Sequence, residues 1–207
     1  MYYDQLELEE GKSLNKIIEN SKSNPKWQEM MKGSPAFMTG SKPEDVLNEI
    51  QSDPYLANLK VVNFTVGEDV LNETQNEPAY VNSEDNSSTV GKVDTKGNAK
   101  TKLGISDGGP TAICLENAET KELYFVYRGT NRLEWIDNAE GFLQTSSRMQ
   151  EHAVAFFNKT MEAGGYEEKG YTINVTGHSK GGNKAQYVTI VSEHKVDNCI
   201  NFDGQGF

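Results

Sequence analysis

The chain is poor in the residues that several functional classes need. Its 207 residues include two cysteines and three histidines, and 20 basic residues stand against 31 acidic ones, for a net charge of -11. Nucleic-acid binding requires clustered Lys and Arg to contact phosphates, and adhesion to anionic membrane surfaces requires them as well. The charge balance therefore argues against both classes of partner.

The two cysteines do not indicate a metal centre. Cys114 and Cys199 each lie in an apolar, strand-like run, and neither has a second Cys or a His at metal-ligand spacing. We therefore expect no metal site, and the pattern favours buried free thiols over the alternative, a disulfide.

Long hydrophobic runs are also missing. No apolar stretch reaches the length that a bilayer-spanning helix needs, and the first ten residues are acidic rather than the basic start of a signal peptide. The sequence leaves the location open between the cytoplasm and export by a non-classical route.

What is present describes one α/β domain. A hydrophobic content of 35% with 25% charged residues is typical of a soluble globular protein. We expect residues 1–59 to form a helical segment, with helices near 13–18 and 43–50 and Ser41 as a cap, that packs on a core formed by residues 60–207. The polar stretch at about 72–102 is interpreted as a long insertion.

The order of elements in the core predicts the sheet. Alternating, β-branched runs predict strands at 60–66, 111–115 and 123–127, the last two joined as a hairpin. A helix capped at Ser146 or Ser147 and ending near 164, a strand at 171–176, a helix at 182–194 and a strand at 198–202 follow. Alternation of strands and helices predicts a parallel sheet with right-handed crossovers.

One motif carries chemistry. Residues 177–181 read G-x-S-x-G between a β-branched run and an amphipathic helix, the setting of a nucleophile elbow in which a sharp turn exposes the serine. Gly177 and Gly181 stand where larger residues would clash, Ser179 is the candidate nucleophile, and the backbone N–H of Lys180 is the expected first oxyanion donor. The alternative is a glycine-rich turn with an incidental serine.

A second oxyanion donor is expected from another loop at the same edge of the sheet. The segment Arg128-Gly-Thr130 directly follows the strand at 123–127. Thr130 can offer both an N–H and a hydroxyl, and Gly129 permits a close approach of backbone to substrate.

Three ordered motifs resemble those of the class 3 lipases, which are α/β hydrolases. They are Y-R-G-T at 127–130 with Trp135 and Asp137 after it, the elbow V-T-G-H-S-K-G-G-N at 175–183, and N-F-D-G-Q-G-F at 201–207, and the likeness covers roughly residues 60–207. The closest similarity is to a bacterial branch whose elbow reads GHSKGGN. The resemblance implies an α/β-hydrolase-type, mostly parallel sheet flanked by helices, with Ser179 as nucleophile and Thr130 in the oxyanion hole. It also implies a lid at 131–145 that brings Trp135 and Phe142 to an acyl-binding cleft, and ester substrates of the acylglycerol or phospholipid type.

The chain departs from this family at the triad histidine. Hydrolases of this fold follow the order Ser, Asp, His, and only His194 follows Ser179, at the far end of the expected helix, about 20 Å away. For His152 and His178 the pattern favours packing or surface roles. Asp203 is either the acid or a structural residue of a Gly-rich turn. We expect the fold to be incomplete at its C-terminal end, with a partner or a missing C-terminal segment supplying the rest.

The sequence therefore predicts a serine esterase or lipase that hydrolyses carboxylic ester bonds of lipids through an acyl-enzyme on Ser179. The alternative is a catalytically inactive α/β-hydrolase scaffold that binds a lipid or a protein partner, and transacylation through the same serine is a third reading. Acyl transfer through a serine needs no cofactor, so none is expected.

Overall fold

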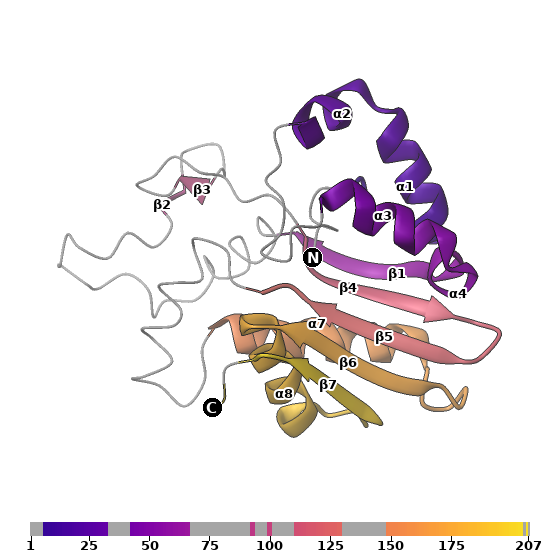
Figure 1. The fold of residues 1–207 in the computed structure, drawn as a ribbon. Helices are drawn as coiled ribbons and strands as arrows, with labels where there is room; N and C mark the ends of the chain where they lie inside the picture. Colours follow the sequence, from indigo (N-terminus) through magenta and orange to yellow (C-terminus); the bar gives the residue numbers. More distant parts are fainter. Residues whose placement is uncertain are drawn as a thin grey trace.

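A computed structural model describes residues 6–32, 42–66, 92–93, 99–100, 110–129, 148–204 and 206. Five strands form the central sheet in the order β1-β4-β5-β6-β7 (Figure 1). They are β1 (Lys60–Val66), β4 (Pro110–Asn117), β5 (Glu122–Tyr127), β6 (Thr172–His178) and β7 (Asn198–Phe202). The helices are α1 (Leu14–Ser23), α2 (Pro25–Lys32), α3 (Pro43–Ser52), α4 (Pro54–Asn58), α7 (Arg148–Gly164) and α8 (Lys180–Val191). Two short strands, β2 (Lys92–Val93) and β3 (Ala99–Lys100), pair with each other inside the expected insertion.

The sheet is mixed. β1 pairs antiparallel with β4, and β4 pairs antiparallel with β5, whereas β5, β6 and β7 run parallel. The expectation of a mostly parallel sheet thus describes only the half that ends in β7. In the other half, β4 and β5 are antiparallel because a tight turn joins them, and antiparallel strands can be joined in this way without a crossover.

The expected hairpin between β4 and β5 is confirmed. The side-chain oxygen of Asn117 accepts the backbone N–H groups of Glu119 (3.1 Å) and Thr120 (3.2 Å), and Lys121 takes a left-handed conformation at φ 55°. Asn at such a turn satisfies backbone donors locally and lets the chain reverse. The hairpin sets β5 beside β4, and the parallel half of the sheet then begins at β5.

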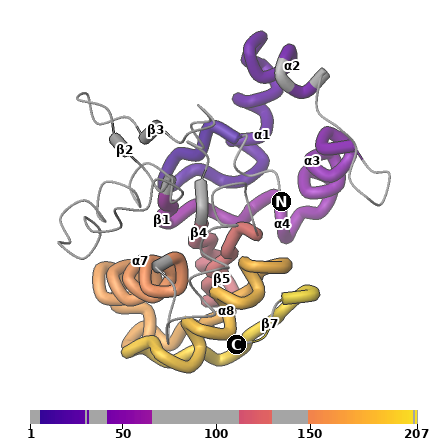
Figure 2. The backbone as a smooth tube through the Cα atoms, turned by 90° about the vertical axis from the view of Figure 1, so that its left-hand side faces the viewer, coloured from indigo at the N-terminus to yellow at the C-terminus, as the bar shows by residue number. Residues whose placement is uncertain are grey.

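The sheet carries a different apolar core on each face. On one face, strand residues such as Phe125 and Val175 pack with Phe157 of α7 and Val188 of α8. On the other, alternate strand residues such as Ile113 pack with side chains from α1, α2 and α3. Viewed along the strands, α7 and the pair α3 and α4 lie on opposite sides of the sheet (Figure 2). The N-terminal helices therefore share a core with the sheet; the division into 1–59 and 60–207 stays a prediction.

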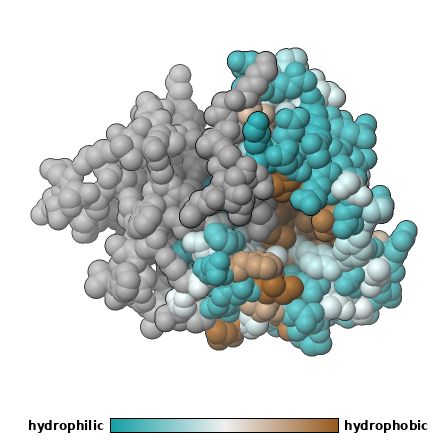
Figure 3. All heavy atoms as spheres, in the orientation of Figure 1, coloured by the Kyte–Doolittle hydropathy of each residue, from teal (hydrophilic) through white to brown (hydrophobic). Residues whose placement is uncertain are grey.

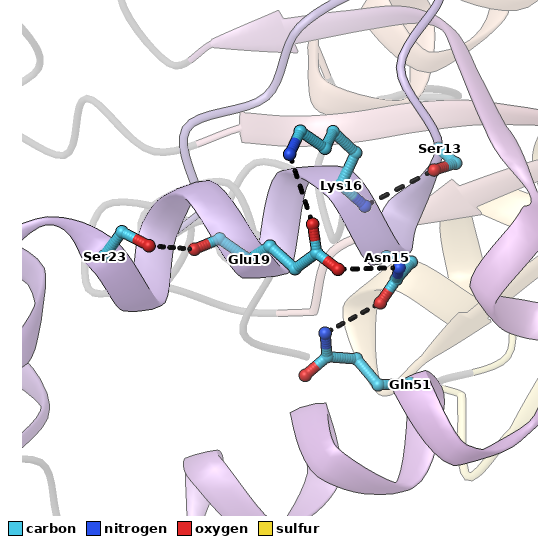
Figure 4. Close-up of polar contacts among 6 residues, drawn as sticks. All are labelled: Ser13, Asn15, Lys16, Glu19, Ser23 and Gln51. Atoms are coloured by element: carbon cyan, nitrogen blue, oxygen red, sulfur yellow. Dashed lines mark hydrogen bonds and ion pairs between the residues drawn. The ribbon is translucent and has the colours of Figure 1, made fainter.

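Polar contacts fix α1 at its start and against α3. The Ser13 hydroxyl accepts the backbone N–H of Lys16 (3.3 Å), which is the side-chain cap that the first turn of a helix requires. The Gln51 amide of α3 donates to Asn15 of α1 (2.8 Å), as Figure 4 shows. For α3 the N-terminal cap position is Lys42 rather than the expected Ser41, which lies outside the described residues, and the Asp45 carboxylate accepts the Lys42 N–H (3.1 Å).

The expectation of two buried thiols is wrong for Cys199. Cys114 is fully buried in the core, but Cys199 is exposed, and neither is in a disulfide. The reason lies in the position of β7, which pairs only with β6 in the described sheet and leaves Ile200 46% and Phe202 56% exposed. In the orientation of Figure 1, apolar patches interrupt the polar surface where β7 and α8 lie (Figure 3). The apolar run that forms β7 therefore does not correspond to buried side chains.

Within the described part of the chain, no helix has the length and apolar character needed to cross a membrane.

The apolar core on the α7 face is expected to contribute strongly to the free energy of unfolding. Phe157 has no exposed surface, and its ring centroid lies 4.5 Å from that of Phe125. Phe157→Ala is expected to lower the free energy of unfolding by about 3–5 kcal/mol, since it removes the buried ring and leaves a cavity. Ile190→Ala on α8, where the side chain is 71% exposed, is the control and is expected to change it by less than about 0.5 kcal/mol. Urea denaturation measures both, and similar losses for the two variants would contradict the assignment of this core.

Carboxylates that hold the loop between α8 and β7 predict an acid-sensitive contribution to stability. Asp197 accepts the Ile173 N–H (2.9 Å), and Glu167 accepts the Lys195 N–H (2.6 Å). These backbone hydrogen bonds lower the pKa of Asp197 below its ordinary 3.8 and that of Glu167 below its ordinary 4.5. Because both pKa values are lowered on folding, their stabilisation is complete above the ordinary values and is lost as the pH falls through the folded ones.

We therefore compare the free energy of unfolding of the wild type with that of the double variant Glu167→Gln and Asp197→Asn. The two values should differ most near neutral pH. The difference should shrink steadily from about pH 5 downward, as the wild-type carboxylates take up protons. Urea denaturation at a series of pH values measures it. A difference that stays constant from pH 7 to pH 2 would show that the two carboxylates do not act through their charge.

Candidate active site

Ser179 occupies the sharp turn between β6 and α8. β6 ends at His178, α8 begins at Lys180, and Ser179 has φ 56° and ψ -123°. Such a conformation is strained for a residue with a Cβ and persists only where surrounding contacts impose it. The Ser179 N–H donates to the carbonyl of Phe202 at the end of β7 (3.0 Å), and its own carbonyl accepts the Asn183 N–H (3.2 Å). The serine is thus held by the neighbouring strand on one side and by the helix on the other.

Glycines at positions 177 and 181 are required by contact, as the motif predicts. A Cβ on Gly177 would overlap the backbone of Gly181, and a Cβ on Gly181 would overlap the carbonyl oxygen of Tyr127. The first turn of α8 therefore lies directly on the ends of β6 and β5. This close crossing aims the N-terminal end of a 12-residue helix at the space beside Ser179, where its N–H groups and dipole favour negative charge.

The loop after β5 touches the elbow. A Cβ on Gly129 would lie 2.8 Å from the carbonyl oxygen of His178 and 3.7 Å from Cβ of Ser179. The close approach that the sequence analysis assigned to the substrate is made here to the elbow itself. Thr130, the expected second oxyanion donor, follows Gly129 directly but lies outside the described residues, as do Trp135 and Phe142 of the expected lid.

The first half of α8 is buried although it is polar. Every residue from Lys180 to Ala185 is buried, and Lys184 is only 2% exposed. The Lys184 ammonium donates to the carbonyl of Arg128 (3.3 Å), and the Gln150 amide of α7 donates to the side-chain oxygen of Asn183 (2.8 Å). The elbow helix is therefore tied by hydrogen bonds to the β5 loop and to α7. Sequence reasoning missed Asn183, Lys184 and Gln150, and the only signal was the run G-G-N-K after the elbow.

The turn after β7 also packs on the start of α8. Asn201 accepts the Gly204 N–H through its side-chain oxygen (2.8 Å), and the Asn183 amide donates to the carbonyl of Gly206 (3.3 Å). Asp203 follows β7, is exposed, and takes a left-handed conformation at φ 47°. The parallel register pairs Phe202 with His178, so Asp203 lies at the same sheet edge as Ser179. Both of its expected roles, acid or turn residue, stay predictions.

The three histidines lie in different places. The Nδ1 atom of His194 is 3.2 Å from a carboxylate oxygen of Glu167, which precedes β6, so His194 lies at the opposite end of that strand from Ser179. Seven strand residues span roughly 20 Å. His178 is exposed next to Ser179, the candidate nucleophile. His152 lies on α7 two residues after Gln150, and side chains two apart do not share a helix face, so it does not point with Gln150 toward Asn183.

Family comparison places these elements in a known group of sequences. The model of a domain of unknown function, DUF6792, matches residues 69–202, about two thirds of the chain. The chain belongs to the DUF6792 family. The match spans the sheet from β4 to β7 with the elbow at Ser179, and it begins after the N-terminal helices. No curated protein and no solved structure matches the chain.

The strained turn predicts an inverted response to glycine and alanine. Ser179→Gly removes the Cβ that strains a positive φ, whereas Ser179→Ala keeps it, so the glycine variant should be more stable than the alanine variant by about 1 kcal/mol. Ser192, at φ -61° and ψ 151°, is the control position. There the order should reverse, because glycine only adds flexibility to the unfolded chain. Thermal unfolding of the four variants measures which of the glycine and alanine variants is more stable at each position. The same order of stability at both positions would rule out a strained elbow.

Proposed function

We propose that this protein is a serine esterase or lipase that cleaves carboxylic ester bonds of lipids through an acyl-enzyme on Ser179. The observation that carries the proposal is the conformation of Ser179, with φ 56° at a strand-to-helix turn whose flanking glycines allow contact with the backbone. Sharp turns of this kind present a serine hydroxyl at the carboxyl edge of a sheet.

The chemistry follows from the neighbours of Ser179. Its Oγ attacks the carbonyl carbon of the ester, the carbonyl oxygen becomes an oxyanion beside the start of α8, and the alcohol leaves with a proton. Water then releases the acid and regenerates the hydroxyl. The backbone N–H of Lys180 and, by the sequence analysis, Thr130 are proposed to stabilise the oxyanion, while Asp203 is proposed as the acid of the triad.

A particular class of ester fits the exposed apolar surface near the site. Phe202, which is 56% exposed, pairs in register with His178, the residue before Ser179. An acyl chain that leaves the elbow along this strand would meet the exposed apolar side chains of Phe202 and Ile200. Acylglycerol or phospholipid esters are therefore proposed over small polar esters.

One observation favours the second candidate, an inactive scaffold that binds a lipid or a protein partner. His194 is engaged with Glu167 at the opposite end of β6 from Ser179, so it is not placed to act as the base. A serine without a base loses most of its reactivity and leaves mainly binding and oxyanion stabilisation.

Labelling of the full-length protein with a fluorophosphonate probe separates the two candidates. The enzyme is expected to form a covalent adduct on Ser179, located by peptide mass spectrometry, and Ser179→Ala should abolish it. Ser192→Ala, on the C-terminal end of the same helix, is the matched control and should label normally. Active protein is then assayed on long-chain phospholipids and short-chain p-nitrophenyl esters. Lipid binding with no labelling would favour the scaffold and reject the hydrolase.

A further inference from the structure

A buried lysine lies beneath the loop that approaches the nucleophile. Lys184 is 2% exposed, and its Nζ is 3.3 Å from the carbonyl oxygen of Arg128. Taking an ammonium out of water costs several kcal/mol unless polar groups surround it. A methionine of similar length would fill the same space without that cost. The charge therefore calls for a role other than packing.

The contact joins the two segments from which an oxyanion hole would be built. Gly181 and Lys184 are three residues apart and share a face of α8. A Cβ on Gly181 would lie 2.9 Å from both the carbonyl carbon and the carbonyl oxygen of Arg128. The same face of the helix thus meets the Arg128 carbonyl twice, once through the backbone of Gly181 and once through the ammonium.

Glycine at position 129 explains why an anchor is needed. A side chain there would come within 2.8 Å of the His178 carbonyl oxygen, so only glycine fits against the elbow. Glycine, however, leaves its two flanking peptide groups free to rotate. A hydrogen bond to the Arg128 carbonyl fixes the peptide that joins Arg128 to Gly129, which removes one of these freedoms.

We propose that Lys184 is a positioning residue of the Ser179 site, whose buried ammonium holds the Arg128 carbonyl and so keeps the Arg128–Gly129 turn against the elbow. The proposal rests on the esterase function proposed above. It extends that function by assigning to Lys184 the alignment of the β5 loop relative to the nucleophile. The lysine touches no reacting atom and acts only through the loop.

Lys184→Met in the full-length protein tests the role. It keeps the length of the aliphatic chain but removes the donor, so the helix keeps its packing while the turn loses its anchor. Thr189→Val is the matched control, since it deletes one hydrogen bond within α8, from the Thr189 hydroxyl to the carbonyl of Ala185 (2.7 Å), near the C-terminal end of the helix. Where the methionine variant does not fold, Lys184→Gln retains a shorter, uncharged donor and is measured in the same way.

Three measurements are combined. Lys184→Met is expected to slow fluorophosphonate labelling of Ser179 about ten- to a hundredfold, as small displacements of a catalytic group do. On a p-nitrophenyl ester, kcat should fall by a similar factor with KM nearly unchanged, since the lost alignment acts in the transition state. Amide hydrogen exchange should become faster in the peptide that contains Tyr127, Arg128 and Gly129. Thr189→Val should leave all three as in wild type.

The failures are distinguishable. If wild type labels and turns over while folded Lys184→Met matches it in labelling rate and kcat, the positioning role is overturned and the esterase stands. If Lys184→Met only lowers the melting temperature, with normal rates for the folded molecules, the lysine is structural and the proposal is again overturned. If wild-type protein does not label at all, the esterase and the positioning role fail together.

Discussion

The close crossing of α8 over the ends of β5 and β6 is the constraint on which the rest of the site depends. Helix and strands meet backbone to backbone at Gly177 and Gly181, without side chains between them. A helix so close to the strand that precedes it can be reached only through a turn as sharp as that at Ser179. The positive φ of the serine is therefore a consequence of the crossing.

The crossing also explains why the core on the α7 face looks as it does. Beyond its first turns α8 packs through Ala185 and Val188 onto Phe125 and Val175, which anchors the helix by ordinary apolar burial. The polar first half cannot be held in that way, and hydrogen bonds from Gln150 and Lys184 take over there. Apolar packing thus sets where the helix lies, and buried polar contacts set how its N-terminal end faces the loops.

Much of the fold could be predicted from sequence, because most strands are β-branched runs bounded by turn residues. β1 and β7 have the predicted bounds, and β5 begins one residue earlier. The predicted start of α8 is two residues too late, because the periodicity argument requires buried residues to be apolar. The buried residues at the start of this helix are Lys, Gly, Gly, Asn and Lys. The sequence does not predict the short helices α2 and α4, because neither contains a long apolar period. The predicted burial of Cys199 is wrong because a sequence does not distinguish an edge strand from a central one.

For the site, local chemistry was predictable and distant contacts were not. The need for Gly177 and Gly181 follows from the motif, because their neighbours lie within a few residues or on the next strand. The hydrogen bond from Lys184 to the Arg128 carbonyl joins residues that are 56 positions apart, and no local sequence pattern predicts it. The carboxyl ends of β5, β6 and β7 meet at one edge of the sheet, where parallel strands place their functional loops. The antiparallel hairpin of β4 and β5 affects that edge only by holding β5 in register. The mixed sheet therefore leaves the parallel half intact as the platform for Ser179.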